Sequence, residues 1–474
     1  MTAPFLESYC YLSKPGHGTI TILREIPVAD PGPHERQILE IANTLAFLCV
    51  QGPQSEVYAV ALRLTGESLK IYIAENNEVP EKTKDHLENL LSKLSQISVT
   101  TSQSVPRISP DLEDAVTLSQ EHEFGVMALK HSFPSFFRSL TKRDHTWDTR
   151  IAQIREQLVD ENEMAETFER IVRSLDIIYK FAERYHDTKD EQTLSDLYEF
   201  LSLFDELIRR SLAKQIIATM LKKLDPGDND APLLAVELKN EADINPDNTL
   251  QDGFSITRFI YRIIATVIHI RRLLLLAVSP RLVQIFRHPA VVQCCPLRKQ
   301  TVTVYSDKSS DFEVPGLVSS FENTTNLNVT LHAELNVFQT LLEAALIRGE
   351  HPYWVIGVSK LTCISCYTLI RKAFPAVLGQ HIDHGLAPIT LQDCHGKLYS
   401  SWAAPDLSFA EPYVQFDLNS EVRMRAEHFI RTSLLEYVQR SRFFEKGGGY
   451  EELNTKLNEL RERYRGVYKS RSGL

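Results

Sequence analysis

The sequence predicts an α/β fold that carries a large helical region, and three patterns lead to this prediction. Residues 57–62 and 69–73 are apolar, rich in β-branched and aromatic side chains, and joined by a short segment containing Gly66, which is typical of a β-hairpin. Residues 331–373 show the patterns of a helix, a strand and a helix in turn. Between these two parts, residues 111–290 have mainly the apolar spacing of helices.

The remaining elements follow from the same patterns. Residues 35–50 carry apolar side chains on one helical face, and residues 82–94 are predicted to form a second helix of this kind. Residues 98–111 are rich in serine, threonine and proline, which indicates a linker. Extended structure is expected again at residues 301–305, and residues 419–437 show the pattern of a further amphipathic helix.

Length and composition limit the class of protein. With 474 residues, 43% of them hydrophobic and 24% charged, the chain is long enough for two or three globular domains. Its seven cysteines form no disulfide framework, which is typical of a reducing compartment. The first residues lack the basic start and apolar core of a signal peptide, so we expect an intracellular protein, cytoplasmic or nuclear, that is not secreted.

The most apolar stretch, residues 259–286, is expected to be a buried helix pair and not a membrane span, because it is interrupted by four arginines: Arg262, Arg271, Arg272 and Arg281. We therefore expect no membrane partner.

The formal net charge of −10 is unevenly distributed. Residues 151–250 contain 22 acidic and 12 basic residues, a net −10, whereas residues 255–300 contain eight basic residues and no acidic one. Such an asymmetry indicates either an anionic partner at the basic segment or neutralisation by the acidic segment packed beside it. Strong non-specific binding to duplex nucleic acid is disfavoured, since it requires many unpaired basic groups.

Four residues in the last third of the chain carry the strongest chemical signal. His332 and Glu334 form a His-x-Glu sequence, and Cys363 and Cys366 form a Cys-x-x-Cys sequence. One imidazole nitrogen and two thiolates can bind Zn²⁺ tetrahedrally and leave the fourth position open for water, as a catalytic zinc site requires. The sequence therefore predicts a zinc site of these three ligands, with Glu334 beside it as a proton-transferring group.

The local pattern places each ligand near the start of a helix. His332 opens the predicted helix 331–346, and Cys363 opens the next one, for which Thr362 or Ser359 is the predicted cap. Helix N-termini favour thiolate formation, because their free N–H groups and the helix dipole stabilise negative charge.

The sequence leaves other interpretations of these residues open. A Cys-x-x-Cys can be a metal-free redox pair or half of a closed structural zinc site, in which Cys394 or His395 would supply the fourth ligand. A second His-x-Glu begins at His86, on a predicted surface helix, so this short motif is a weak signal by itself. Three downstream histidines are expected at ordinary loop or strand positions, and a second metal site is the alternative: His381, His384 and His395.

The motif region resembles the cytidine-deaminase-like superfamily. More narrowly, it is similar to the fungal deaminase-like proteins that are grouped with a rickettsial relative as the OTT-type family. The resemblance covers residues 300–405 and rests on segments 328–334, 357–366 and 394–405. This chain departs from the superfamily pattern at Thr362, where proline usually precedes the first cysteine; threonine can cap the helix that proline would otherwise start.

The resemblance implies a three-layer fold, with helices on both faces of a mixed five-stranded sheet and a helix and hairpin ahead of the His-x-Glu helix. Here that helix and hairpin lie far upstream, in residues 1–100. We therefore predict that residues 111–295 form a helical insertion or accessory domain, that residues 299–410 form the zinc-binding core, and that residues 411–474 form a helical tail. Loops tolerate long insertions at modest entropic cost; two independent domains are the alternative.

The resemblance also implies an enzyme, one that removes an amino group hydrolytically and zinc-dependently from a cytosine- or adenine-type base. The expected substrate is a nucleoside or a single-stranded nucleic acid, and the basic segment 255–300 together with the large helical region favours a polymer. A catalytically inactive interaction protein that retains a structural zinc site is the alternative.

Two further residues are candidates for substrate contact. Asn328 lies four positions before His332, where the superfamily often places a residue that hydrogen-bonds the sugar or the base; a turn position is the alternative. Trp402 can stack on a base or lie in the hydrophobic core.

Overall fold

The computed structural model describes residues 32–52, 56–104, 116–141, 162–209, 256–304, 325–379, 386–392, 402–414 and 416–430, together with the short pieces 151–152, 154–156, 158 and 394. All structural statements below concern these residues.

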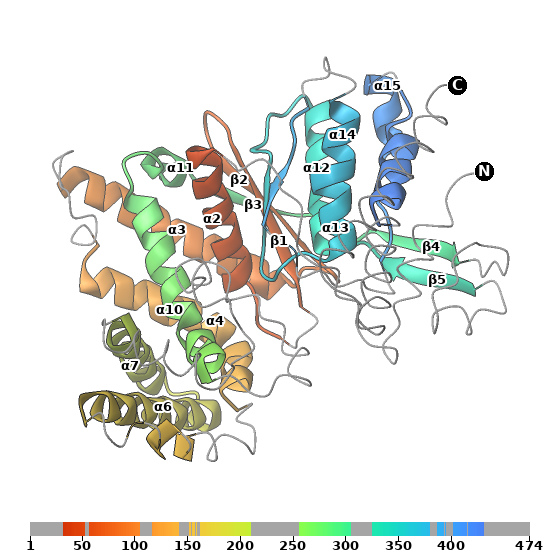
Figure 1. Cartoon of the computed structure of the whole chain (residues 1–474). Helices are drawn as coiled ribbons and strands as arrows, with labels where there is room; N and C mark the ends of the chain where they lie inside the picture. The colour runs from red at the N-terminus through yellow and green to blue at the C-terminus, as the bar shows by residue number, and fades with distance from the viewer. Residues whose placement is uncertain are drawn as a thin grey trace, which may run out of the picture.

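A five-stranded mixed sheet in the order β3-β2-β1-β6-β7 organises the α/β fold (Figure 1). β1 (Tyr58–Leu64) and β2 (Leu69–Glu75) form the predicted antiparallel hairpin, in which Leu64 lies opposite Leu69. β1 also pairs antiparallel with β6 (Val355–Val358), the predicted strand of the motif region. Two segments that lie far apart in the chain therefore form one sheet.

The two edges of this sheet come from different parts of the chain. β3 (Ala290–Cys294) pairs parallel with β2, and β7 (Thr390–Leu391) pairs parallel with β6. β3 lies within the segment 111–295 that was predicted to be helical, so this prediction is wrong at the end of the segment. The physical reason is pairing: Ala290 to Cys294 align with Leu69 to Ile73 and satisfy backbone groups at the sheet edge.

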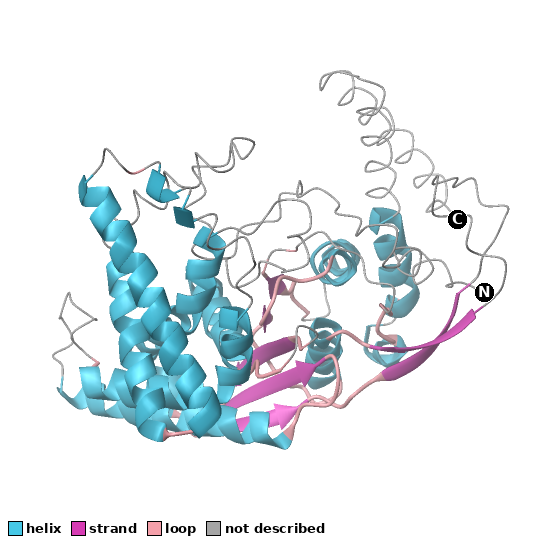
Figure 2. Cartoon of the chain, turned by 90° about the horizontal axis from the view of Figure 1, so that it is seen from below, coloured by secondary structure: helices cyan, strands magenta, loops and turns pink. Residues whose placement is uncertain are grey.

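Both faces of the sheet are buried, because successive side chains of a strand point to opposite faces. Val60 and Ile71 belong to the core that also contains helix α2 (Pro33–Leu48). Ala61 and Tyr72 belong to a second core, which contains helix α12 (Ala333–Leu346). Figures 1 and 2 show the strands between these two groups of helices.

The central segment is helical over most of its described residues. It comprises α4 (Leu118–Thr141), α6 (Asn162–Thr188), α7 (Glu191–Arg209), α10 (Ile256–Val278) and α11 (Val283–Arg287). α10 contacts α2, α3, α4 and α7, so these helices lie on the α2 side of the sheet (Figure 1). α10 and α11 are the expected buried helix pair, and none of the helices in the described ranges is both long and apolar enough to cross a membrane.

The predicted linker at residues 98–111 is wrong in its first part. Helix α3 (Glu81–Ser104) continues through these positions, because its apolar face is still buried at Ile97 and because the Ser98 hydroxyl donates to the carbonyl of Val283 at 3.4 Å. Residues 105–111 lie outside the described part of the chain.

Carboxylates neutralise at least three arginines of the basic segment. Arg271 pairs with Glu121 at 2.7 Å and with Asp205 at 2.5 Å, and Arg272 pairs with Glu40. Arg298 forms a bidentate pair with Glu343, with both N–O distances 2.8 Å. Asp205 belongs to the acidic segment, and so does Glu206, which lies 3.4 Å from Arg271, as the neutralisation alternative expects. The other three partners come from elsewhere: Glu40, Glu121 and Glu343.

A small second sheet and the C-terminal part flank α12. β4 (Lys299–Val304) and β5 (Thr325–Thr330) pair antiparallel, which confirms extended structure near residue 301. Residues 418–430 are helical, as predicted for the start of the tail, and the residues beyond 430 lie outside the described part.

Candidate metal centre

The N-terminus of α12 carries the first half of the motif. His332 is the N-cap of the helix, and Glu334 lies in its first turn. The side chain of Asn76, just after β2, accepts a hydrogen bond from the Ala333 N–H at 2.9 Å. This contact satisfies one of the helix's free N–H groups and fixes the start of α12 against the hairpin.

The helix after β6 carries the second half. It consists of α13 (Ile364–Thr368), a π-helical turn (Leu369–Ala373) and α14 (Phe374–Leu378). Cys363 is its N-cap, and its Sγ accepts from the Cys366 N–H at 3.4 Å. The prediction that Thr362 or Ser359 caps this helix is therefore wrong. Ser359 instead accepts from the Tyr58 N–H at 2.9 Å, which ties the end of β6 to β1.

The fold brings the three predicted ligands together. The Nδ1 atom of His332 lies 3.5 Å from the Sγ of Cys363 and 3.4 Å from the Sγ of Cys366. The three ligand atoms all lie within 4.8 Å of one another, so the group could hold a metal ion. Zn–S and Zn–N bonds of about 2.3 and 2.05 Å at a tetrahedral angle place sulfur and nitrogen about 3.5 Å apart, so the observed distances fit zinc.

The electrostatics of the cluster also suit a metal cation. Burial by itself would raise the pKa of Cys363, but hydrogen bonding with Cys366 and the charge of His332 lower this pKa well below its ordinary value. Burial and the hydrogen bond with Cys363 raise the pKa of Cys366. Burial opposes protonation of His332, yet the neighbouring Cys363 thiolate raises its pKa. A positive neighbour therefore stabilises negative charge on the Cys363 sulfur, and a bound metal cation would supply such a charge beside both sulfurs.

Glu334 lies beside these ligands and is 3% exposed. Burial raises the pKa of its carboxyl group to about 7, and the charge of Cys363 adds to the rise. Its Oε2 atom and the Thr362 hydroxyl are buried and have no hydrogen-bond partner in the described part of the chain. Buried polar atoms in native proteins nearly always have a partner, so unpaired oxygens at such a cluster indicate a place for a bound ion, water or substrate.

A closed zinc site would need a fourth protein ligand, for which Cys394 and His395 are the candidates. Within the described ranges, the ligand group contains His332, Cys363 and Cys366 and no further member. Cys394 forms a parallel β-bridge with Thr362, so its backbone lies beside the site. His395, like His381 and His384, lies outside the described residues.

The structure assigns different environments to the other candidates. Asn328 lies in β5, paired with Thr301, so it is not a turn residue. Trp402 is 1% exposed and belongs to the core around α12. His86 is buried and stacks on His131 with ring centroids 3.7 Å apart. The prediction that the His-x-Glu sequence at His86 lies on a surface helix is therefore wrong for its histidine.

Sequence reasoning missed Asn76, and it singled out Trp402 without finding its contact with the motif. Asn76 caps α12, and Trp402 donates its indole N–H to the Sγ of Cys366 at 3.2 Å. Asparagine is a common capping residue, but Asn76 lies 257 residues from Ala333, so no local pattern links them. Trp402 lies 36 residues from Cys366, which is also too far for a local pattern to reveal the role of its N–H.

Comparison with known proteins gives one family match. Residues 331–406 match the family model OTT_1508_deam, which describes a deaminase-like family, and this match supports a deaminase-like assignment for the segment. It contains His332, Glu334, Cys363, Cys366 and Trp402. Neither the curated proteins nor the solved structures include a match to the chain.

Proposed function

We propose that this chain is a zinc-dependent hydrolase that removes an amino group from a cytosine- or adenine-type base. The observation that carries the proposal is the buried, unpaired Glu334 oxygen beside three side chains that suit a metal ion. A structural zinc site has no need of a carboxylate next to its ligands, whereas a hydrolytic deaminase requires one to move protons. The family match of residues 331–406 supports the same activity.

Each residue of the site has a distinct task in this proposal. His332, Cys363 and Cys366 would hold Zn²⁺, which when bound supplies Lewis-acid activation of water. Glu334 would accept a proton from water and deliver it to the ring nitrogen of the base. It would then accept the proton of the newly formed C–OH group and pass it to the leaving amine. The Asn76 cap would hold the first turn of α12, and with it His332 and Glu334, in a fixed position.

The proposal includes a cytidine-deaminase-like arrangement of the site within the fold. It is supported by the contacts of α2 with β1 and β6 on one face of the sheet and of α12 with the same strands on the other face. Both ligand-bearing helix starts also belong to the core that contains Ala59 of β1 and Val358 of β6. The substrate would be a nucleoside or a base in a single-stranded nucleic acid. The pairing of Arg271, Arg272 and Arg298 with carboxylates leaves fewer cations for a polymer and favours the smaller substrate.

The decisive assay incubates the zinc-loaded chain with cytidine, adenosine, single-stranded DNA and tRNA, and measures released ammonia and altered bases. We expect conversion of at least one of these, with loss of activity in Glu334→Gln. Full zinc occupancy without conversion of any of them, together with a fourth protein ligand in the zinc absorption spectrum, would favour the non-catalytic interaction protein.

A further inference from the structure

The second sulfur of the cluster accepts a hydrogen bond from outside the motif. The Nε1–H group of Trp402 donates to the Sγ of Cys366 at 3.2 Å, and the tryptophan is 1% exposed. The first sulfur, that of Cys363, accepts from the Cys366 N–H. Each of the two sulfur atoms is therefore contacted by an N–H donor, one from the backbone of the helix and one from a side chain of a separate segment.

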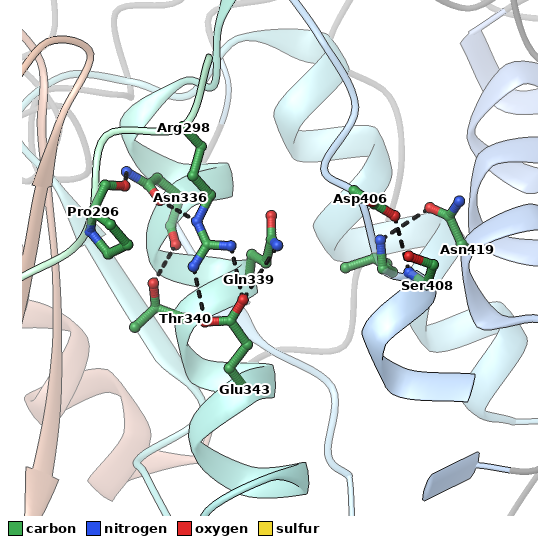
Figure 3. Close-up of polar contacts among 10 residues, drawn as sticks. Pro296, Arg298, Asn336, Gln339, Thr340, Glu343, Asp406, Ser408 and Asn419 are labelled. Atoms are coloured by element: carbon green, nitrogen blue, oxygen red, sulfur yellow. Dashed lines mark hydrogen bonds and ion pairs between the residues drawn. The ribbon is translucent and has the colours of Figure 1, made fainter. Parts of the chain in front are cut away.

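The segment that carries Trp402 is fixed at several points. Arg423 donates from Nη2 to the carbonyl of Ala404 at 3.2 Å, and Asn419 accepts from the Leu407 N–H at 3.1 Å. The Ser408 N–H donates to Asp406 at 3.0 Å (Figure 3). Both Asn419 and Arg423 lie in the helical residues 418–430, beyond the end of the family match. The C-terminal helix thus fixes the backbone at Ala404 and Leu407, shortly after Trp402 in the same segment.

These contacts are more specific than core packing requires. An indole N–H needs a partner when it is buried, but a carbonyl oxygen would satisfy it equally well. Here the partner is a sulfur atom of the ligand cluster. A donor to a thiolate withdraws charge from the sulfur and fixes its orientation, and residues in contact with metal ligands commonly control metal affinity in this way.

We propose that Trp402 is a positioning residue of the metal centre: its indole N–H holds the Cys366 thiolate and limits the charge that this sulfur donates to the metal. The proposal rests on the proposed metal site, but not on its reaction. It extends the centre to Asn419 and Arg423, because their side chains bind the backbone of the segment that carries Trp402.

The test compares two tryptophan substitutions in the full-length chain. Trp402→Phe keeps an aromatic ring but removes the N–H. Trp354→Phe is the matched control, because Trp354 packs against the same core and is not among the residues that contact the sulfur atoms in the described structure. The readouts are Zn²⁺ affinity by competition with a chelator, and the sulfur-to-metal charge-transfer band of the chain loaded with Co²⁺ alone.

We expect Trp402→Phe to weaken Zn²⁺ binding about 10- to 100-fold, because the Cys366 sulfur loses the contact that fixes its orientation and stabilises its negative charge. The charge-transfer band should move to longer wavelength, because the sulfur donates more strongly without the hydrogen bond. Trp354→Phe should change neither readout. Asn419→Ala keeps the indole but loosens its segment, so it should shift the Zn²⁺ affinity and the band in the same direction and to a smaller extent. If circular dichroism shows that Trp402→Phe is unfolded, Asn419→Ala serves as the test in its place.

The outcomes separate this proposal from the proposed function. Unchanged affinity and an unchanged band in folded Trp402→Phe, or in Asn419→Ala if it must serve instead, would overturn the role of Trp402 and leave the metal site standing. Equal shifts in Trp354→Phe would assign the effect to core packing and overturn it as well. A wild-type chain that binds neither Zn²⁺ nor Co²⁺ would overturn both proposals.

Discussion

The side chain of Asn43 accepts a hydrogen bond from the Val358 N–H at 2.8 Å, across 315 residues of sequence. Asn43 lies in α2, and Val358 is the last residue of β6, shortly before Cys363. Next to it, a Cβ atom on Gly357 would lie 2.2 Å from the backbone of Ala42. The first described helix therefore lies directly on the strand that leads to the metal ligands, and glycine permits this close approach.

Gly357→Ala should destabilise the fold and weaken the metal site. The added methyl group meets backbone atoms of α2, which cannot rotate away, so we expect a loss of about 1–3 kcal/mol or more in the free energy of unfolding. Chemical denaturation measures this loss. Gly66→Ala is the control, because nothing lies within 4 Å of a Cβ at that position. Equal stability of the two variants would contradict the close packing of α2 on β6.

The purified chain should contain about one zinc ion, held by His332, Cys363 and Cys366. Cys363→Ser or Cys366→Ser should remove most of it and lower the melting temperature, because metal binding stabilises the folded state. Cys294→Ser, at a cysteine of the edge strand β3, should retain the metal. The zinc content per chain is measured by metal analysis. Stoichiometric zinc in both Cys363→Ser and Cys366→Ser would mean that other residues bind it.

Glu334→Gln should separate chemistry from metal binding. Glutamine has nearly the same size but cannot accept a proton, so any deaminase activity should fall by at least about 10²-fold while zinc content and stability persist. Glu67→Gln, in the exposed hairpin loop, serves as the control and should leave activity unchanged. Undiminished activity of Glu334→Gln would refute the proposed proton transfer.

The free energy of unfolding should decrease as the pH falls from about 6.5 to about 4, in part because of the stacked pair of His86 and His131. Burial lowers the pKa of His86 to about 3 and that of His131 to about 4. Above the ordinary histidine pKa of about 6.5, both states are neutral and the pair contributes no pH dependence. Below it, the unfolded chain gains protons that the folded chain does not, so the free energy of unfolding falls by up to about 1.4 kcal/mol per pH unit for each histidine.

The variant that tests this origin replaces both histidines by phenylalanine, which keeps a stacked aromatic pair. Urea denaturation at several pH values should then show a shallower decrease of stability than in the wild type. An unchanged slope would mean that groups other than His86 and His131 cause the acid sensitivity.

We propose that the helical part of residues 111–295, which precedes β3, is inserted into one deaminase-like domain, because β1 pairs with β6 across this segment. A fragment of residues 299–474 lacks β1 and β2, exposes the edge of β6 and should aggregate. A chain that joins residues 1–104 to 289–474 through a flexible linker keeps all five strands and should bind zinc. Size-exclusion chromatography with metal analysis distinguishes the cases. A soluble, monomeric, zinc-loaded 299–474 fragment would refute the insertion.

The sequence alone determined most secondary-structure elements and the residue types of the centre. Helical spacing predicted α2 and α12, and β-branched runs predicted β1, β2 and β6, because these periodicities arise from local backbone geometry. The His-x-Glu and Cys-x-x-Cys sequences likewise lie within single turns of chain, so their spacing shows which side chains can meet. Local patterns failed where partners were distant: α3 continues past its predicted end, and β3 replaces helix, because packing and pairing outweigh propensity.

Only the tertiary structure decided which distant residues complete the centre. Asn76 reaches the start of α12, Asn43 supports the end of β6, and Trp402 contacts Cys366, each from a segment whose own sequence gives no sign of its partner. The pairing of Arg271, Arg272 and Arg298 with carboxylates was decided in the same way. Hydrogen bonds and ion pairs depend on atoms within a few ångströms, and the distances between segments far apart in the chain follow from the folded packing and not from any local pattern.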